Sequence, residues 1–402
     1  MIEITNFKAN YGDTFLIEVA LPDVDPVYLL VDCGFGFATG ALPVISDLGK
    51  QGKKISRFII THFDADHIAW AYAFLENNGT AAKPRIIGIE QIWLNTFRHL
   101  QFDKNERVIA TPNDPILLGA AMAAFKPFAP GEEKEIGAKQ ALLLGRLILS
   151  SGYDWNTDFN QQAASVHQEV LIGNDIRLTL LTPTMEKLQA LEVEFIAKLK
   201  EFKLSVNKDL FFDDAFELFL LQKSAKEKSK EGLISASTEE ISATAIDNIG
   251  ESAHYDPDDA IGNGSSISFL LEVTDKRMLF LADAHAEDII SALTEKMDDK
   301  GSAMLFDVVK VAHHGSFRNN NPALFAMIDS DKWIFSTNGK HPKHTHPDFA
   351  TIAHIVKRPL PQQYAMRTLY FNYELAHLLA LNDPELKDRF KYDVKVQPTI
   401  SL

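Results

Sequence analysis

The chain has 402 residues, of which 46% are hydrophobic and 24% charged, which is ordinary for a soluble globular protein and excludes wholesale disorder. Its formal net charge of −15 disfavours non-specific binding to nucleic acid, because the average field repels phosphate. Cys33 is the only cysteine, which excludes an intramolecular disulfide and a cysteine-rich zinc module. The N-terminus lacks the layout of a signal peptide, and no apolar stretch is long enough for a membrane span. We therefore expect a cytoplasmic protein without membrane contact.

The first hundred residues are predicted to form strands and one helix. Short apolar runs rich in β-branched and aromatic residues predict strands at 14–19, 27–31, 58–60 and 89–94. A helix is expected over 68–75, and the segment Asn77-Asn78-Gly79 is typical of a helix end.

The middle of the chain is predicted to be mostly helical. Within 101–170 the clearest helical pieces are 120–125 and 141–149, and a strand follows at 176–181. Thr182-Pro183 then begins a helix whose apolar stripe is predicted to pack on the core. The stripe consists of Leu188, Leu191, Phe195, Leu199 and Phe202.

A compositional break at 223–262, rich in Lys, Ser, Thr, Glu and Asp, predicts a solvated loop or disordered insertion. The alternative is a basic arm that contacts substrate. Strands are expected again at 266–273, 278–281, 308–311 and 333–336. Strands in both halves, with helices between them, indicate α/β layers in which one sheet packs on another.

A dense group of polar side chains lies between the strand at 58–60 and the helix that follows it. The segment His62-Phe63-Asp64-Ala65-Asp66-His67 offers two imidazoles and two carboxylates in six residues. Such a set can neutralise divalent cations and still leave positions open for water. The alternative is a polar loop in which Asp66 caps the helix.

Further polar residues follow other predicted strands in the same way. Asp32, Asp283, the His313-His314-Gly315-Ser316 segment and His346-Pro347 each come at or shortly after the end of an apolar run. Polar side chains at five strand ends are what an active site at one edge of a β-structure requires.

On these residues the sequence resembles the metallo-β-lactamase superfamily, and within it the ComEC-like branch. The family's His-x-His-x-Asp-His motif matches residues 62–67, with Asp64 at the second ligand position as in that branch. The other motifs match, in order, Gly12-Asp13-Thr14, Val31-Asp32-Cys33-Gly34, Asn263-Gly264-Ser265-Ser266-Ile267, Ala282-Asp283-Ala284, Val309-Lys310-Val311-Ala312-His313-His314-Gly315-Ser316 and His346-Pro347. His344 competes with His346 for the closing position.

The resemblance covers roughly 5–100, 170–185 and 260–358. It implies an α/β fold, the αββα metallo-β-lactamase sandwich, as a single domain over 1–402 with helical or loop insertions at 101–170 and 186–261. It also implies one or two divalent metal ions, Zn²⁺ or Mn²⁺, since Asp64 hardens the site.

The resemblance also implies roles for individual residues. His62 and Asp64 would hold one metal, Asp66 and His67 the other, Asp283 would bridge them and His346 would complete the second site. Asp66, His313 and His314 are the candidate catalytic residues. His313 or His314 would protonate the leaving group or stabilise the developing oxyanion. The alternative is that these histidines form hydrogen bonds to the metal ligands. Asp13 and Asp32 are further candidates for the metal site, and Ser316 and Asn263 are candidates for substrate binding.

Three departures from the branch stand out. Ile68-Ala69 replaces Gly-Gly after the first motif, and Ala282 replaces the Gly before Asp283. Both changes reduce backbone freedom near the ligands. A separate third-motif histidine is not evident. His99 is the candidate, and a structural or substrate-contacting role is the alternative for it.

The predicted function is a metal-dependent hydrolase that uses a metal-bound hydroxide, most simply a phosphodiesterase or nuclease. Its partner would be a phosphodiester such as single-stranded DNA or a nucleotide. A hydrolase of a small carbonyl substrate (lactone, β-lactam or thioester) is one alternative. A metal-binding scaffold or regulatory subunit without turnover is another.

Overall fold

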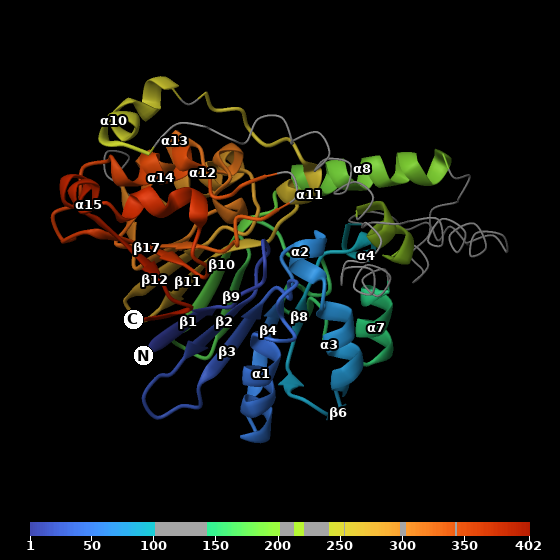
Figure 1. The fold of residues 1–402 in the computed structure, drawn as a ribbon. Coiled ribbons are helices and arrows are strands. Elements are labelled where there is room, and N and C mark those ends of the chain that lie inside the picture. The colour runs from blue at the N-terminus through green and yellow to red at the C-terminus, as the bar shows by residue number, and fades with distance from the viewer. Residues whose placement is uncertain (101–142, 202–212, 221–240, 253, 298–302, 342–343) are drawn as a thin grey trace.

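The computed structural model describes residues 1–100, 143–201, 213–220, 241–252, 254–297, 303–341 and 344–402. Two sheets form the middle of the fold, and helices lie on both outer sides (Figure 1). Among the described residues, no helix is long and apolar enough to cross a bilayer.

The first sheet has the strand order β19-β1-β2-β3-β4-β7, and β8 also pairs with β4. Its strands are β1 (Ile2–Asn6), β2 (Phe15–Val19), β3 (Val27–Val31), β4 (Lys54–Ile59), β7 (Gly88–Ile89), β8 (Ile92–Trp93) and β19 (Thr399–Ser401). β3 and β4 run parallel, whereas β2 runs antiparallel to β3. The carboxyl ends of β3 and β4 therefore meet the start of β2 at one edge.

The second sheet has the order β18-β17-β16-β14-β12-β11-β10-β9. Its strands are β9 (Glu169–Ile172), β10 (Ile176–Thr182), β11 (Ser268–Val273), β12 (Lys276–Phe280), β14 (Val308–Lys310), β16 (Lys332–Phe335), β17 (Arg367–Phe371) and β18 (Tyr392–Val396). From β12 to β18 all neighbours are parallel. Two small two-stranded sheets pair β5 (Gly79–Thr80) with β6 (Lys83–Pro84) and β13 (Met304–Phe306) with β15 (Ile328–Ser330).

Alternation along the strands builds the layers. On β3, Leu29 and Val31 point between the sheets, whereas Tyr28 and Leu30 point towards the helices, as the two-residue period of a strand requires. Phe15 of the first sheet meets Phe280 of the second, with ring centroids 6.0 Å apart. The core between the sheets is thus made by both of them.

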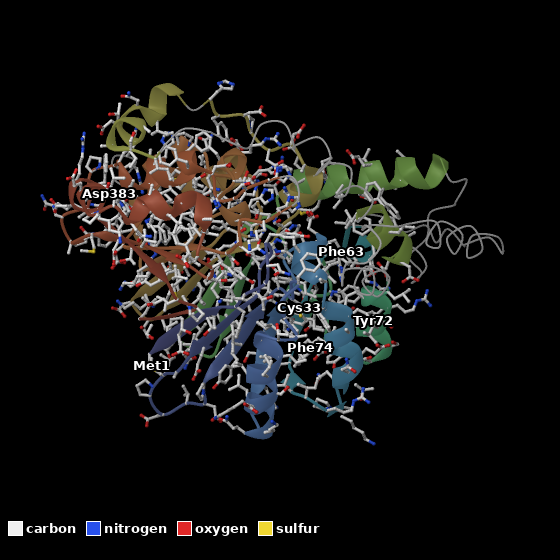
Figure 2. All side chains as sticks on the ribbon, viewed as in Figure 1. Met1, Cys33, Phe63, Tyr72, Phe74 and Asp383 are labelled. Carbon is white, nitrogen blue, oxygen red and sulfur yellow. The ribbon has the colours of Figure 1, made fainter. Side chains whose placement is uncertain are left out.

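Helices cover the outer face of each sheet (Figure 1). The cluster outside the first sheet includes buried residues of α1 (Ala41–Lys50), α2 (Ala65–Ile68), α3 (Ala71–Asn78), α4 (Phe97–Leu100), α7 (Leu144–Ser150), α8 (Met185–Glu201) and the helical residues 213–220. The one outside the second sheet includes α10 (Ala243–Ser252), α12 (Ala286–Thr294), α13 (Pro322–Met327), α14 (Phe349–Val356) and α15 (Pro384–Phe390). Cys33, Phe63 and Phe74 belong to the first cluster (Figure 2). The α/β/β/α layering confirms the predicted fold class.

Most strands lie where the sequence predicts them, with shifted ends. The apolar run 89–94 is split into β7 and β8, and the helix expected at 68–75 forms two pieces, α2 and α3. Leu188, Leu191 and Phe195 of the predicted stripe are buried against the first sheet's helices. The side chain of Leu199, all of Phe202 and the predicted helix at 120–125 lie outside the described residues.

The loop predicted over 223–262 is wrong for the residues that form helices, whereas residues 254–260 have no regular secondary structure. Residues 243–252 form α10, and Ile261–Gly264 form the short helix α11. Ile246 and Ile249 are three residues apart and both buried in the core, so one helical face packs although the segment is polar overall. Residues 223–240 lie outside the described part of the chain.

Candidate metal centre

The topology brings chemically active residues from distant parts of the chain to one edge. Asp32 follows β3, His62 follows β4, Asp283 follows β12 and His313 follows β14. Each strand of the two pairs β3/β4 and β12/β14 is parallel to its partner, so their carboxyl ends meet at a shared edge of each sheet. Asp13 precedes β2 and lies at the same edge.

Four imidazoles converge on the carboxylate of Asp283, which is 1% exposed. Its Oδ2 lies 3.8 Å from Nε2 of His62, 3.3 Å from that of His67, 3.6 Å from that of His313 and 3.7 Å from that of His314. All four rings are buried. A carboxylate among nitrogens of this kind is the donor set of a transition-metal site.

The inward-facing atoms of this group lack hydrogen bonds. Nε2 of His62, His67 and His314 and both oxygens of Asp283 are buried, and none makes a hydrogen bond of normal geometry with a described residue. Buried polar atoms without partners are costly. A divalent cation would satisfy these donor atoms together, so the residues present fit the metal that the sequence predicts.

The outward-facing nitrogens of His62 and His67 are held by a shared polar group. Nδ1 of His67 donates to Oδ2 of Asp32 at 2.8 Å. The backbone N–H and hydroxyl of Thr61 also donate to Asp32, and Nδ1 of His62 lies 3.0 Å from that hydroxyl. Such contacts orient each ring and direct Nε2 inward. Asp32 therefore acts on the centre through His67.

Charge within the centre shifts several pKa values. Burial favours the neutral ring of His67, but Asp283 and Asp32 together raise the pKa of that ring well above its usual value. Burial, followed by the charge of His67, lowers the pKa of His62. Burial alone would raise the pKa of Asp283, yet the surrounding histidines, above all His67 and His313, hold it well below its usual range.

Asp13 and Lys310 form a buried ion pair beside the centre. The Lys310 ammonium also donates to the carbonyl of Ala282 at 3.2 Å and lies 4.0 Å from Oδ1 of Asp283. Burial opposes the charge on Asp13, but Lys310 and His314 keep the pKa of this carboxyl below its ordinary value. Lys310 thus supplies a fixed positive charge next to the carboxylates.

His314 links this ion pair to Asp66. Its Nδ1 donates to the carbonyl of Ser336 at 2.8 Å and lies 3.3 Å from Asp13, while its Nε2 lies 3.4 Å from Oδ2 of Asp66. Burial alone would lower the pKa of His314, but the negative charges of Asp283 and Asp13 have the larger effect and raise this pKa to about 9. His314 therefore carries a proton at neutral pH when no cation is bound.

Donor atoms of His and Asp side chains approach within 4.8 Å of one another in four overlapping groups among the described residues. The groups are His62, His67 and Asp283; Asp66, His67 and His314; Asp13, Asp32 and His67; and Asp13, Asp283 and His314. The first two contain most of the predicted ligands. Asp66 is not a helix cap, since it lies inside α2, and Asp64 holds the cap position.

Two predicted ligands, Asp64 and His346, lie outside those four groups, as does the competing candidate His344. Asp64 is buried and raises the pKa of His62, against the larger effect of burial. The ring of His346 lies 5.5 Å from that of His313 and stacks on His344, with centroids 5.6 Å apart. Both histidines therefore border the centre.

His99 is held by contacts of its own. Its Nδ1 accepts from the backbone N–H of Thr96 at 3.1 Å, and its ring packs edge-on against Trp155. Burial, followed by the charge of Arg98, lowers the pKa of His99 to about 3. The ring is thus a neutral, buried acceptor in α4, and it belongs to none of the four groups.

The predicted substrate-contacting residues are both buried. The side-chain amide of Asn263 donates to Oδ2 of Asp258 at 2.7 Å and lies 3.5 Å from Nδ1 of His313. The backbone N–H of Ser316 donates to the carbonyl of His313 at 2.8 Å. Asn263 is therefore committed to a neighbour within the protein.

Sequence reasoning missed four residues of the site: Lys310, Thr61, Asp258 and Asn319. Lys310 and Thr61 stand directly inside or beside the motifs, so their position was the available signal. Asn319 lies three residues beyond Ser316, and Asp258 lies in a segment predicted to be a loop insertion. Nothing local marks these last two.

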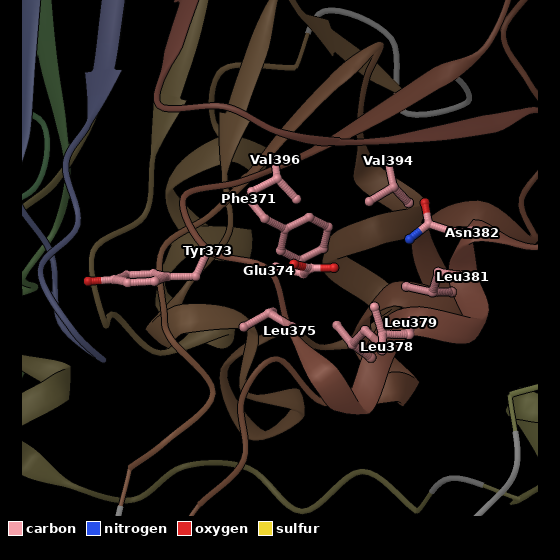
Figure 3. A pocket seen from close by; sticks show the side chains of 10 residues that line it. All are labelled: Phe371, Tyr373, Glu374, Leu375, Leu378, Leu379, Leu381, Asn382, Val394 and Val396. Atoms are coloured by element: carbon pink, nitrogen blue, oxygen red, sulfur yellow. The ribbon is translucent and has the colours of Figure 1, made fainter.

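An apolar pocket lies apart from the centre, and Figure 3 shows its lining by residues of β17, β18 and the 3₁₀ helix Ala376–Asn382. Phe371, Leu375, Leu378 and Val394 line it, with Glu374 as its single charged group. None of its lining residues belongs to the metal centre.

The sequence matches the profile of the family described as the metallo-beta-lactamase superfamily over residues 12–119. That segment includes Asp13, Asp32 and the motif at 62–67 and ends before Asp283. Residues 12–119 are thus similar to the metallo-β-lactamase superfamily, and this match, together with the His/Asp groups, suggests a metal-dependent hydrolase. No protein of curated function matches the sequence.

Among solved structures, the chain is similar to Zn²⁺-bound PqqB from Methylobacterium extorquens, with 10% identity, 100% of both chains covered and a TM-score of 0.38. At this level the likeness says nothing about substrate or ligands.

Proposed function

We propose that this chain hydrolyses phosphodiesters, acting as a nuclease on single-stranded DNA or as a phosphodiesterase on a nucleotide. The observation that carries the proposal is the buried carboxylate of Asp283 with four imidazole nitrogens around it and further carboxylates beside it. Carboxylate-rich sites suit hard cations and phosphoryl oxygen chemistry. The resemblance to the ComEC-like branch supports the same substrate class.

The residues that would hold metal are His62, Asp66, His67 and Asp283, which all belong to the first two of the four groups of donor atoms. When bound, Zn²⁺ or Mn²⁺ would polarise a phosphoryl oxygen and lower the pKa of a coordinated water. The chain's own contribution is orientation: Asp32 and Thr61 fix the rings of His67 and His62.

Charge in the site also suits a phosphodiester. Lys310 offsets the carboxylate of Asp13, and His314 lies 3.3 Å from Asp13 and 3.4 Å from Asp66. A proton held at Nε2 of His314 can be given to a leaving alkoxide, which is general acid catalysis. Positive groups fixed beforehand in a buried site stabilise developing negative charge strongly.

The test replaces the central carboxylate. Asp283→Asn should lower kcat/KM at least 100-fold towards bis-p-nitrophenyl phosphate and single-stranded DNA in the presence of Mn²⁺ or Zn²⁺. Asp25→Asn is the matched control, because Asp25 is 95% exposed and distant in the fold from the centre. Steady-state kinetics and metal content by elemental analysis are measured on the same samples.

The outcomes separate the alternatives. Equal activity in Asp283→Asn and Asp25→Asn contradicts the proposal. Hydrolysis of a β-lactam, lactone or thioester, with no phosphodiester cleaved, identifies a carbonyl hydrolase instead. Stoichiometric metal without turnover of any of these substrates identifies a metal-binding scaffold.

A further inference from the structure

The segment around Asp258 reaches the metal centre from outside the motifs. Arg318 holds this segment, because its guanidinium donates to the carbonyls of Asp256 at 3.3 Å and Pro257 at 3.0 Å. The backbone N–H of Asp258 donates to the carbonyl of Arg318 at 3.1 Å. These contacts fix Asp258, which is 5% exposed, beside Arg318 and Asn319, a few residues beyond His313.

The carboxylate of Asp258 determines the orientation of the side-chain amides of Asn263 and Asn319. Its Oδ2 accepts from Nδ2 of Asn263 at 2.7 Å and from Nδ2 of Asn319 at 2.9 Å. Because a carboxylate can only accept, the NH₂ group of Asn319 must face it. The same NH₂ group also faces the carbonyl of Asp283 at 3.2 Å, so a flipped amide would lose both acceptors.

The orientation of Asn319 then determines the proton on His313. With its NH₂ group turned to Asp258, Asn319 presents Oδ1 to Nδ1 of His313 at 2.8 Å. An amide oxygen is only an acceptor, so Nδ1 must carry the proton. In the neutral ring the lone pair is then on Nε2, which lies 3.6 Å from Oδ2 of Asp283 and faces the centre.

We propose that Asp258 and Asn319 are positioning residues that hold His313 as the Nδ1–H tautomer, so that Nε2 serves the centre as an acceptor or metal ligand. This settles His313 in the ligand-like role and leaves the proton-donating role to His314. The tautomer does not depend on the substrate. Only the expected effect on turnover rests on the proposed phosphodiesterase activity.

The test compares Asp258→Asn with Asp256→Asn, a substitution in the same segment at a side chain that is 50% exposed. Selective ¹⁵N labelling of histidine distinguishes protonated from unprotonated ring nitrogens, and His313→Gln assigns the signals. We expect Nδ1–H in the wild-type chain and in Asp256→Asn. In Asp258→Asn the NH₂ group of Asn319 loses its carboxylate acceptor and is held less firmly, so the Nε2–H form should appear beside the Nδ1–H form and the Kd for Zn²⁺ should rise 10–100-fold.

A double variant, in which the residues at positions 258 and 319 are exchanged, tests the same hydrogen bonds. Asp258→Asn combined with Asn319→Asp swaps amide and carboxylate, so the new carboxylate at 319 can accept from both Nδ1 of His313 and the amide at 258. Recovery of the Nδ1–H signal and of metal affinity in the double variant would not follow from a merely structural role. On bis-p-nitrophenyl phosphate, Asp258→Asn should lower kcat with KM unchanged, and the double variant should regain part of the loss.

Two results would overturn the proposal: an Nε2–H signal for His313 in the wild-type chain, or identical spectra and Kd values for Asp258→Asn and Asp256→Asn. A double variant that folds but keeps the spectrum of Asp258→Asn also contradicts it. Absence of phosphodiester cleavage, with the expected tautomer and Kd changes, contradicts only the proposed function. Should Asp258→Asn not fold, the wild-type spectrum and the double variant still decide.

Discussion

The loops of the metal centre hold backbone conformations that L-amino acids rarely adopt. Asp32, Ala282, His313 and His314 all have positive φ angles, of 59°, 46°, 43° and 54°. Such conformations cost roughly 1–2 kcal/mol for a residue with a Cβ. At Ala282 the sequence departs from the Gly of the family motif, and its carbonyl accepts from the backbone N–H of His313 and from Lys310. These two bonds hold the strained turn that places Asp283.

A pH effect on stability is expected from His99. Its pKa is lowered from 6.5 to about 3 in the folded chain, so on acidification the unfolded state takes up the proton first. The stability contributed by the neutral ring is therefore complete above pH 6.5 and falls as the pH drops towards 3. At pH 5 the loss relative to neutral pH should be about 2 kcal/mol.

The measurement is the free energy of urea unfolding at pH 7.5 and pH 5. His99→Asn keeps an acceptor near the N–H of Thr96 but cannot ionise, so its loss between the two pH values should be smaller than that of wild type by that amount. His167→Asn removes an exposed histidine, with 52% of its side chain accessible, and should keep the wild-type pH dependence. An equal pH dependence in His99→Asn and wild type would show that burial does not hold His99 neutral.

Local sequence was enough to find the residues that face the centre. His62, Asp66, His67, Asp283, His313 and His314 each lie in or directly after a short motif at the end of an apolar strand, which a single sequence displays. Asp258 and Asn319 are 61 residues apart along the chain. Asp258 orients Asn319, and Asn319 in turn orients His313, so neither residue touches the centre directly as a ligand. Their roles depend on how two loops meet, which no local pattern encodes.

At the level of elements, the loop before β2 packs directly on α2. A Cβ added at Gly12 would come within 1.9 Å of the carbonyl oxygen of Asp66. Because that neighbour is backbone, Gly12→Ala must displace α2 and its ligands. We expect a loss of about 1–3 kcal/mol in unfolding free energy and a reduced metal content.

Gly250→Ala is the matched control for this substitution. Gly250 lies in α10, and a Cβ there would meet only the mobile Nζ of Lys357 at 3.2 Å. This variant should be unchanged or more stable by up to about 1 kcal/mol, with full metal content. Urea unfolding and elemental analysis check both variants, and equal behaviour of the two would refute the packing argument.

Most of the elements that the sequence predicts are buried strands, although the buried strands β1 and β17 were not predicted. β2, β3, β10, β11, β12, β14 and β16 are apolar enough to identify alone. β18 was not predicted, because it is an edge strand with a largely polar sequence, Tyr392-Asp393-Val394-Lys395-Val396, as edge strands often are. α10 was missed because only two isoleucines mark its buried face.

For the molecule as a whole, metal removal should lower stability without unfolding the chain. Two hydrophobic clusters behind the sheets and one between them hold the layers independently of the centre. The buried carboxylates of Asp13, Asp66 and Asp283 lose a compensating charge on removal. A cation present at 100 times its Kd contributes about 2.7 kcal/mol, so chelation should lower Tm by a few degrees and leave the circular dichroism spectrum intact.

Differential scanning calorimetry with EDTA, followed by Zn²⁺ or Mn²⁺, measures this effect. The metal should restore Tm in the wild-type chain and have little effect in Asp283→Asn. A Tm that is insensitive to chelator and metal in the wild type would mean that the centre contributes no cation-dependent stability.

The domain organisation, a single domain with insertions at 101–170 and 186–261, stays a prediction.

The division of the centre between the two halves of the chain has a consequence for its synthesis. Asp13, Asp32 and the motif at 62–67 leave the ribosome first, whereas Asp283, His313 and His314 come more than 200 residues later. At rates on the order of 5–20 residues per second, the early ligands wait for tens of seconds without the carboxylate on which they converge. A nascent chain therefore has no finished centre until the second sheet has been translated and has packed on the first.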